Sequence, residues 1–512
     1  MNSINKWIIA LSVVLPTLLE VIDTSVVNVS LGHIRGSLSA GVDEATWTIT
    51  AYLVSNAIII PLTGWLSRIF GRKRYLLASI ALFTLSSFMC GSAKTLTALV
   101  FFRVVQGIGG GALQPISQAI LLETFPPKEH GMAMAMFGIG IMVGPILGPV
   151  LGGWITDNWS WNWIFYVNIP IGVASMIMVL MVIKDPPHLL QKIKKNVDYW
   201  GLGLIVVGVG CLQVVLDKGQ REDWFSSDFI VRLSIISLVS IIAFIIVELK
   251  TKHPILDLRE FKNMVFASAN IIQFAVFFVL YASITILPMF CQALMGYDAL
   301  LAGLVLAPGG IATLCMMPLT GFLVDKVNPK AILFSGLLVV AYSMLIMSSF
   351  NLYVDFNMLS WSRIVMGLGL AFIFIPLNSM AFATIPKEEI GNATSIFGLL
   401  RNIAGSFGIA FMTTVLAQRA QFHQFRFSER LNPFDPRYQA SMQKATAVLS
   451  AKTGAASKMA SNGLVYQQLM REANLRSFTD AFHVSLIIML CILPLVFLLK
   501  RPDHSRGQLI GH

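Results

Sequence analysis

Residues 138–153 read GIGIMVGPILGPVLGG, an apolar run without a charged side chain in which glycine and proline recur. In water this composition would weaken a helix, because each interior Gly costs about 1 kcal/mol and each Pro about 3 kcal/mol relative to Ala. In a bilayer, neighbouring helices satisfy the freed backbone groups, and small residues let two helices approach closely. The stretch therefore predicts a bent, tightly packed membrane-spanning helix that takes part in a movement.

The composition of the whole chain supports a membrane environment. Of its 512 residues 56% are hydrophobic and only 12% are charged, whereas soluble domains carry about 25% charged residues. About 20 apolar residues span a bilayer, and this rule predicts fourteen spans, an even number that places both termini on one side. The predicted spans are 7–31, 46–66, 75–93, 96–122, 131–156, 163–183, 199–216, 229–249, 264–290, 298–323, 331–349, 358–382, 392–416 and 477–499.

The basic residues predict which side that is. The formal net charge is +11, and with the termini inside, 20 of the 37 Lys and Arg residues fall on inner segments and five on short outer loops. By the positive-inside rule both termini are then cytoplasmic. The basic excess is therefore interpreted as an orientation signal, and no nucleic-acid partner is expected. Residues 107–112 formally fit a dinucleotide loop but lie in an apolar helix pattern, and the sequence has no P-loop.

An internal repeat divides the chain. Arg103-x-x-x-Gly107-x-Gly109 recurs 260 residues later as Arg363-x-x-x-Gly367-x-Gly369, and Pro61-Leu-Thr-Gly recurs 257 residues later. Such parallel repeats predict two six-helix bundles. We expect a first bundle at 1–183 and a second at 264–512. Residues 184–263 would supply a basic linker and two extra membrane helices.

Several motifs carry a family resemblance over nearly the whole chain. They are Gly64-x-Leu66-x-x-x-x-Gly71-Arg72-Lys73, Arg103-x-x-Gln106-Gly107, Gly144-Pro145-x-x-Gly148-Pro149-x-x-Gly152-Gly153 and Glu20-Val-Ile-Asp23-Thr-Ser-Val-Val-Asn28. With these motifs the chain resembles the major facilitator superfamily, in particular the EmrB-type multidrug exporters of its fourteen-span drug:proton antiporter branch. The resemblance implies an all-α, multi-pass protein of the bacterial inner membrane. It implies a transporter rather than an enzyme, driven by a proton gradient without a cofactor.

The resemblance also implies a set of residues that support conformational change. One departure affects it, because Arg68 stands where the family usually has an acidic residue. Asp325 occupies the matching position in the second copy, so the latch expected at the cytoplasmic ends is altered or carried by that copy. The candidate conformational residues are Gly64, Gly71, Arg72, Asp325, Gly140, Gly144, Pro145, Gly148, Pro149, Gly152 and Gly153.

Two acidic residues in the first span are candidates for proton coupling. A charge at the bilayer centre costs about 2.5–3.5 kcal/mol on insertion scales, so such residues usually face a cavity. Glu20 and Asp23 are three residues apart and share a helix face. We expect Asp23 to be the main proton-coupling carboxylate, with Arg103 as its counter-charge and Glu20 as its partner or as a contact for cationic substrates. The alternative is a static Asp23–Arg103 ion pair that only locks two helices.

Other polar residues in apolar spans are candidates for lining a substrate cavity. For each of them a helix–helix hydrogen bond is the alternative, and the arginine in the list could instead anchor at the membrane surface by snorkelling. The candidates are Asn28, Gln106, Gln114, Gln118, Gln273, Asn378 and Arg401. No spacing of Cys and His residues suggests a metal site.

The longest polar segment, residues 417–476, is predicted to lie outside, and its Ala-rich part favours helix. The resemblance implies that it docks to a periplasmic adaptor and through it to an outer-membrane channel; a solvated cap without a partner is the alternative. The expected function is proton-coupled export of hydrophobic or amphipathic toxic compounds by alternating access. A narrow-specificity exporter of a metabolite or siderophore, or a transporter-derived membrane sensor, remains the alternative.

Overall fold

The computed structural model describes residues 5–126, 129–185, 198–251, 254–324, 326–431, 434, 436–453 and 457–499. These ranges contain helices and connecting turns and no strand. One candidate residue, Asp325, lies outside the described residues, as does most of the basic linker.

The first half and the inserted segment contain helices α1 to α10 and a 3-10 turn. They are α1 (Lys6–Ser37), α2 (Val42–Phe70), α3 (Arg72–Gly91), α4 (Leu96–Gly110), α5 (Leu113–Thr124), α6 (His130–Asn158), α7 (Trp163–Tyr166), α8 (Asn168–Val182), α9 (Tyr199–Lys218), the 3-10 turn η3 (Trp224–Ser226) and α10 (Asp228–Lys250).

The second half begins after the 3-10 turn η4 (Leu258–Lys262) and contains the longest helices. They are α11 (Met264–Met295), α12 (Ala299–Val324), α13 (Pro329–Ser348), α14 (Phe356–Phe382), α15 (Ile390–Arg430), α16 (Pro436–Thr453) and α17 (Ser457–Ile492), followed by the 3-10 turn η6 (Leu493–Leu498).

Thirteen helical segments of the described residues are long and apolar enough to cross a membrane. α6, with 29 residues, runs beside them. The predicted all-α, multi-pass membrane fold is confirmed. The count of fourteen spans, the cytoplasmic placement of the termini and the three domain boundaries stay predictions.

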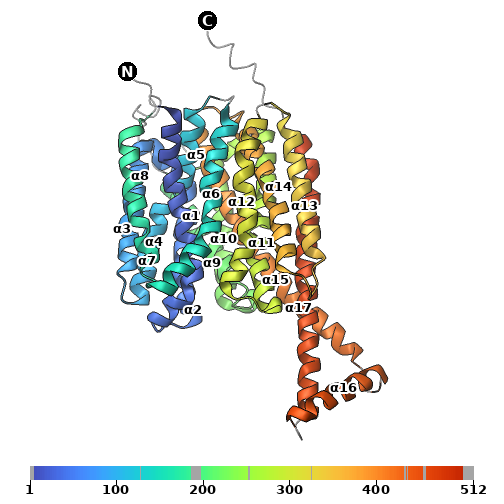
Figure 1. Ribbon diagram of the computed structural model, residues 1–512. Coiled ribbons are helices and arrows are strands. Elements are labelled where there is room, and N and C mark those ends of the chain that lie inside the picture. Colours follow the sequence, from blue (N-terminus) through green and yellow to red (C-terminus); the bar gives the residue numbers. More distant parts are fainter. Residues whose placement is uncertain are drawn as a thin grey trace.

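The helices stand side by side, and the bundle has two distinct ends (Figure 1). The start of α1 and the end of η6 lie at one end, which also carries Lys6 and Arg72 and is here called the basic end. At the opposite end α15 and α17 continue beyond the bundle, and α16 joins them (Figure 1). These three extensions form the arm, and this end is here called the arm end. Most of the predicted loop at 417–476 is therefore helical in the described residues.

The sequence repeat is also a packing repeat. A Cβ added to Gly107 would lie 2.6 Å from the carbonyl oxygen of Tyr52, and one added to Gly367 would lie 2.8 Å from the carbonyl carbon of Gly309. Gly107 and Gly367 are 260 residues apart, and Tyr52 and Gly309 are 257 residues apart. The same close approach of α4 to α2 therefore recurs between α14 and α12.

The two copies differ in one element. The predicted single span at 96–122 is divided into α4 and α5 around Gly111, whereas the corresponding α14 is continuous. The first copy has three successive glycines, Gly109 to Gly111, where the second has Gly-Leu-Ala. Because glycine is the most flexible residue in a helix interior, we attribute the interruption to this run.

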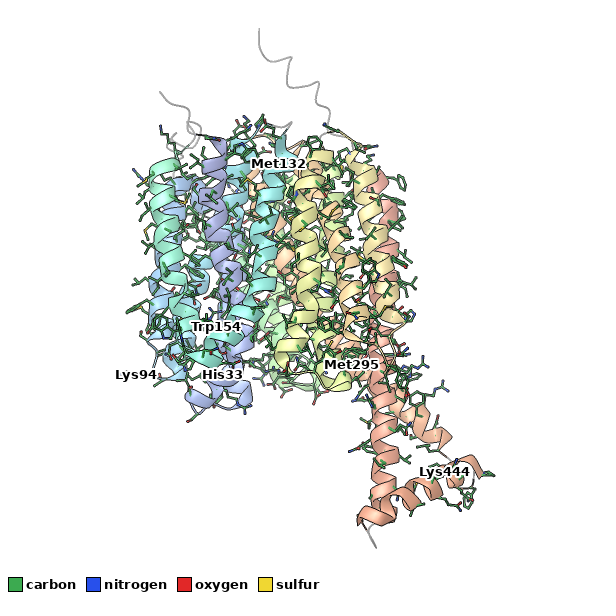
Figure 2. All side chains as sticks on the ribbon, in the orientation of Figure 1. His33, Lys94, Met132, Trp154, Met295 and Lys444 are labelled. Carbon is green, nitrogen blue, oxygen red and sulfur yellow. The ribbon has the colours of Figure 1, made fainter. Side chains whose placement is uncertain are left out.

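The stretch at 138–153 forms part of α6 and packs tightly against α1. A Cβ added to Gly140 would lie 2.9 Å from Val14 Cγ1, one added to Gly144 would lie 2.8 Å from the carbonyl carbon of Val21, and one added to Gly152 would lie 3.1 Å from the carbonyl oxygen of Val26. Gly148 likewise contacts Ser25 of α1. In Figure 2, α6 runs from Met132 near the basic end to Trp154 toward the arm end. The spacing of four residues places one glycine on each helical turn of the contact face, so the predicted close packing is present.

Candidate transport site

A fully buried ion pair joins the first helix to the fourth. Arg103 donates from Nη1 to Oδ2 of Asp23 over 2.6 Å, and both side chains have at most 1% of their surface exposed. Gln106 Nε2 and Asn168 Nδ2 donate to Oδ1 of Asp23 over 2.9 and 2.7 Å. The guanidinium also donates from Nε to the Thr48 carbonyl. Asp23 thus accepts hydrogen bonds from the side chains of three different residues.

Asn168 was not among the candidate residues. It begins α8, and its amide joins Asp23 to Ser87 of α3. The available signal was an amide side chain inside the predicted apolar span 163–183. The structure gives that residue a specific contact.

A second polar chain crosses between the two halves. Glu20 accepts hydrogen bonds from Asn56 Nδ2 over 3.1 Å and from Gln114 Nε2. Gln114 in turn accepts from Arg401 Nη2, which comes from α15 of the second half. Arg401 is 7% exposed and lies over the ring of Phe277, which argues against an anchor at the membrane surface. That it lines a substrate cavity stays a prediction.

The remaining candidates divide into those at the centre and one at the periphery. Gln118 Nε2 donates to Asn378 Oδ1 over 2.7 Å, and these two residues are themselves 260 residues apart, so they are repeat partners. Gln273 donates to the Phe397 carbonyl within the second half. Asn28 is exposed on α1 toward the arm end and is not joined to these residues by the hydrogen bonds described above.

An apolar pocket adjoins the central amides. α6, α11 and α14 provide its lining, which consists of Met142, Gln273, Val276, Phe277, Leu280, Leu370, Ile373, Phe374, Leu377 and Asn378. Only two of these ten residues are polar. This lining is chemically suited to a hydrophobic molecule that a few hydrogen bonds orient. In this conformation the cavity volume is about 10 Å³, room for about one water molecule, so the pocket must widen to hold an organic substrate.

Two equivalent contacts close the basic end. Gly64 of α2 meets Gly391 of α15, where an added Cβ would lie 2.6 Å from the carbonyl oxygen, and Gly64 N donates to Ser395 Oγ over 2.8 Å. Gly321 of α12 meets Gly131 of α6 at 3.3 Å in the same way. Since Gly321 is the repeat partner of Gly64 and Gly391 that of Gly131, each half supplies one member of each contact.

The turn that follows Gly64 is held by charge. Gly71 has φ +83°, a left-handed conformation that favours glycine. Arg72 is buried and forms an ion pair with Glu123, and Lys73 N donates to Asp185 Oδ1 over 2.8 Å. Arg68, which stands where the family usually has an acid, has the carboxylates of Glu248, Asp257 and Glu389 as its charged neighbours.

Acidic residues also meet outside the spans at this end. Burial raises the pKa of Glu260, in η4, to about 8, and the neighbouring carboxylates of Glu389 and Asp257 contribute to the shift. Glu260 is therefore largely protonated at neutral pH. The contact between Glu260 and Glu389 joins the segment before α11 to the turn before α15.

Two repeated helical units with buried charges between their helices are the architecture of a membrane transporter. Residues 13–409 match the family model described as Major Facilitator Superfamily. The chain belongs to this superfamily, whose members are transporters of small molecules rather than enzymes. It is an integral protein of the lipid bilayer.

Within the superfamily the chain is of the EmrB type. It is 34% identical over 501 residues to the multidrug export protein EmrB of Escherichia coli K12. The aligned region covers 98% of this chain and 96% of that protein. It is also 34% identical over 506 residues to the fatty acid resistance protein FarB of Neisseria gonorrhoeae, covering 99% and 98%. These bacterial relatives are consistent with a place in the inner membrane.

Solved structures agree on the fold. The proton:xylose symporter XylE, bound to 6-bromo-6-deoxy-D-glucose, superposes with a TM-score of 0.58 at 15% identity, covering 96% of each chain. At this identity the likeness supports the major facilitator fold alone.

Proposed function

We propose that this protein is a proton-coupled antiporter that exports hydrophobic or amphipathic toxic compounds by alternating access. The names of the relatives, a multidrug export protein and a fatty acid resistance protein, support export of such compounds. The proton gradient supplies the energy, and no cofactor is needed. The apolar pocket beside Gln273 and Asn378 suits a substrate that is mostly hydrocarbon.

The observation that carries the proposal is the hydrogen-bonded chain from Glu20 through Gln114 to Arg401. It joins a carboxylate of the first half to a cation of the second while the basic end is closed. When a proton reaches Glu20, the charge that holds Gln114 disappears and the chain weakens. The state of protonation then changes how strongly the two halves are held together.

Asp23 remains the main coupling carboxylate of the proposal, with Glu20 as its partner. All three donors to Asp23 come from the first half, so a proton that binds Asp23 must loosen Arg103. That movement would shift α1 against α4. Glu20, one helical turn away, transmits the movement to the second half.

Transport assays in inverted membrane vesicles test this division of roles. We expect Asp23→Asn and Glu20→Gln to abolish uptake of a dye driven by a pH gradient, while Asp23→Glu retains part of it. Asp228→Asn, an exposed aspartate at the start of α10, is the matched control. Undiminished gradient-driven transport by Asp23→Asn, at verified expression, would remove Asp23 from the mechanism.

Purified protein separates the antiporter from the other candidate functions. An antiporter releases protons when substrate is added in weakly buffered detergent solution, and the release is lost in Glu20→Gln. A membrane sensor would bind the same compound without releasing protons. A narrow-specificity exporter would show release with one compound only out of a panel of unrelated dyes and drugs.

We further propose that the arm docks to a periplasmic adaptor and, through it, to an outer-membrane channel. Phe425, Phe434 and Met459 expose 63, 85 and 81% of their surface on the arm, and large exposed apolar side chains are typical of interaction sites. Figure 2 shows Lys444 on the same projection. This feature stands well outside the bundle, where a partner can reach it.

Whole-cell resistance with co-expressed adaptor tests the docking. Phe425→Ser with Met459→Ser should lower resistance while uptake into inverted vesicles, which needs no adaptor, stays unchanged. Deletion of residues 440–460 should have the same effect. Unchanged whole-cell resistance in both variants would identify the arm as a cap without a partner.

A further inference from the structure

The second half contains a copy of the buried Asp23 site in which the carboxylate is missing. At the offset of 260 residues, Arg103 corresponds to Arg363, Asp23 to Ser283 and Gln106 to Met366. Arg363 Nη1 lies 3.0 Å from Ser283 Oγ and 3.0 Å from Met366 Sδ. The guanidinium therefore holds the same position between α14 and α11 as its counterpart does between α4 and α1.

Arg363 is a buried cation without a counter-charge. It is 5% exposed, and its Nε has no hydrogen-bond partner. Ser283 provides a hydroxyl in place of the carboxylate, and among the described residues no acidic side chain forms an ion pair with this arginine. A buried charge that lacks a partner is strongly unfavourable, whereas an anion held at the fork of a guanidinium restores both charge balance and hydrogen bonds.

The arginine lies in line with the apolar pocket. On α11, Leu280 of the pocket precedes Ser283 by about one turn, and on α14, Leu370 follows Arg363 by about two turns. The lining continues along the same two helices to Gln273 and Asn378. Arg363 and Ser283 are not part of the lining but lie beyond its end on the same two helices. A cation there is complementary to the anionic head of a molecule whose apolar body fills the widened pocket.

We propose that Arg363 and Ser283 form an anion subsite that takes the carboxylate of an amphipathic organic acid, whose apolar part occupies the adjoining pocket. The first half carries its own carboxylate, Asp23, and the second half receives one from the ligand. The inference rests on the proposed function, because it names a substrate class for that transporter. It is nevertheless a statement about binding and requires no proton gradient.

Decanoate binding to the purified full-length protein in lipid nanodiscs is the test. Decanol, which has the same chain without the charge, is the comparison ligand, and titrations with and without 100 mM chloride separate an organic carboxylate from a small inorganic anion. We expect decanoate to bind at least about tenfold more tightly than decanol, as a hydrogen-bonded charge pair implies. Chloride at 100 mM should weaken decanoate binding only slightly.

Variants of the two residues give opposite signatures. Arg363→Gln should weaken decanoate binding about tenfold or more and leave decanol binding unchanged, and Arg363→Lys should retain part of the preference. Ser283→Asp would supply the missing carboxylate internally, so it should abolish the preference for decanoate while raising the melting temperature. Arg232→Gln, an exposed arginine of α10, is the control.

Ser283→Asp keeps the proposal falsifiable where Arg363→Gln fails to fold. Equal affinity for decanoate and decanol in the wild type, or an undiminished preference in Ser283→Asp, would overturn the subsite. Loss of decanoate binding on addition of chloride would assign the position to an inorganic anion instead. Failure of the proton-release assay with decanoate binding intact would count against the proposed function and leave the subsite standing.

Discussion

The hydrogen bond between Gln118 and Asn378 is the clearest contact of single residues across the two halves. Both residues are at most 2% exposed, and their side-chain amides meet over 2.7 Å. Inside membrane proteins such bonds contribute about 0.6 kcal/mol on average. Because each amide belongs to a different half, this small energy favours the state in which the centre is closed.

A double-mutant cycle measures that contribution. We expect Gln118→Leu and Asn378→Leu each to destabilise the protein, and the double variant to show a coupling energy of about 0.6 kcal/mol, and not above about 1.7 kcal/mol. Reversible unfolding in mixed micelles is the measurement. Strictly additive effects of the two substitutions would mean that the bond contributes nothing to stability.

The pair Glu260 and Glu389 predicts a dependence of stability on pH. The pKa of Glu260 rises from the ordinary value of 4.5 to about 8 in the folded protein, so the folded state binds more protons between these two values. Its contribution to stability is full below about pH 4.5 and is lost as the pH rises through about 8. We expect the melting temperature to fall from pH 6 to pH 9.

Glu260→Gln provides the comparison for this pH effect, because the amide cannot ionise beside Glu389. In this variant the melting temperature should change less between pH 6 and pH 9. Lys262→Gln, an exposed neighbour in η4, should behave as the wild type. An identical slope in the wild type and in Glu260→Gln would assign the pH dependence to other groups.

At the scale of single residues, the sequence predicted which side chains are buried polar candidates better than it predicted their hydrogen-bond partners. The apolar surroundings of Glu20, Asp23 and Arg103 identified them as candidates, and the i to i+3 spacing placed the two acids on one face. The sequence does not specify how α8 and α2 are rotated toward that face. Asn168 and Asn56 were therefore missed as partners, although each is an amide in or beside an apolar segment.

At the scale of elements, the glycines of α6 predict that a single methyl group disturbs the contact with α1. Gly144→Ala would place its Cβ 2.8 Å from the carbonyl carbon of Val21 of α1. Overpacking of this kind typically costs about 1–3 kcal/mol. Gly153→Ala, on the same helix with no atom within 4 Å of the added Cβ, is the matched control. Thermal unfolding in detergent should show a lower melting temperature for the first variant only.

A stable Gly144→Ala protein with unchanged transport would contradict this account of the α1–α6 contact. Gly148→Ala, which would meet Ser25, gives an independent second measurement on the same face. Both substitutions raise intrinsic helix propensity, so a loss of stability in either can be attributed to packing.

The boundaries of elements were predictable where the hydropathy changes and uncertain where it does not. Predicted spans such as 358–382 and 331–349 correspond closely to α14 and α13. The end of the span at 392–416 was set by falling hydropathy, but α15 continues to Arg430 because no proline interrupts residues 390–430. Hydropathy thus predicted where a helix leaves the apolar layer, not where it ends.

At the scale of the whole molecule, α9 links the two halves on one side of the bundle. Near the end of α9, Lys218 Nζ donates to Thr46 Oγ1 of α2 over 2.6 Å, and Asp217 accepts from Thr50. One to two turns earlier, Gln213 Nε2 donates to Ser406 Oγ of α15 over 2.8 Å. α2 and α15 are the helices that also meet at Gly64 and Gly391 at the basic end.

This bridge opposes separation of α2 from α15. We therefore expect the inserted helices to take part in the conformational change and not only to enlarge the membrane-embedded surface. Gln213→Leu removes the hydrogen bond of α9 to Ser406 of α15 and keeps the links to α2, as well as the bond from Trp224 Nε1 to Thr414 Oγ1 of α15. If the lost bond is worth about 0.6 kcal/mol, the population with α2 and α15 apart at the arm end should rise roughly threefold. Thr50→Val should act in the same direction from the other side of the bridge.

Distances between spin labels on the arm-end halves of α2 and α15 measure this population in nanodiscs. Ser237→Ala, which removes a hydrogen bond between α10 and the Gly208 carbonyl of α9 and touches neither half, should leave the distribution unchanged. If Gln213→Leu and Ser237→Ala give the same distribution, α9 does not restrain opening. A larger separated population in Gln213→Leu alone would make the polar contacts of α9 a determinant of how readily the transporter opens.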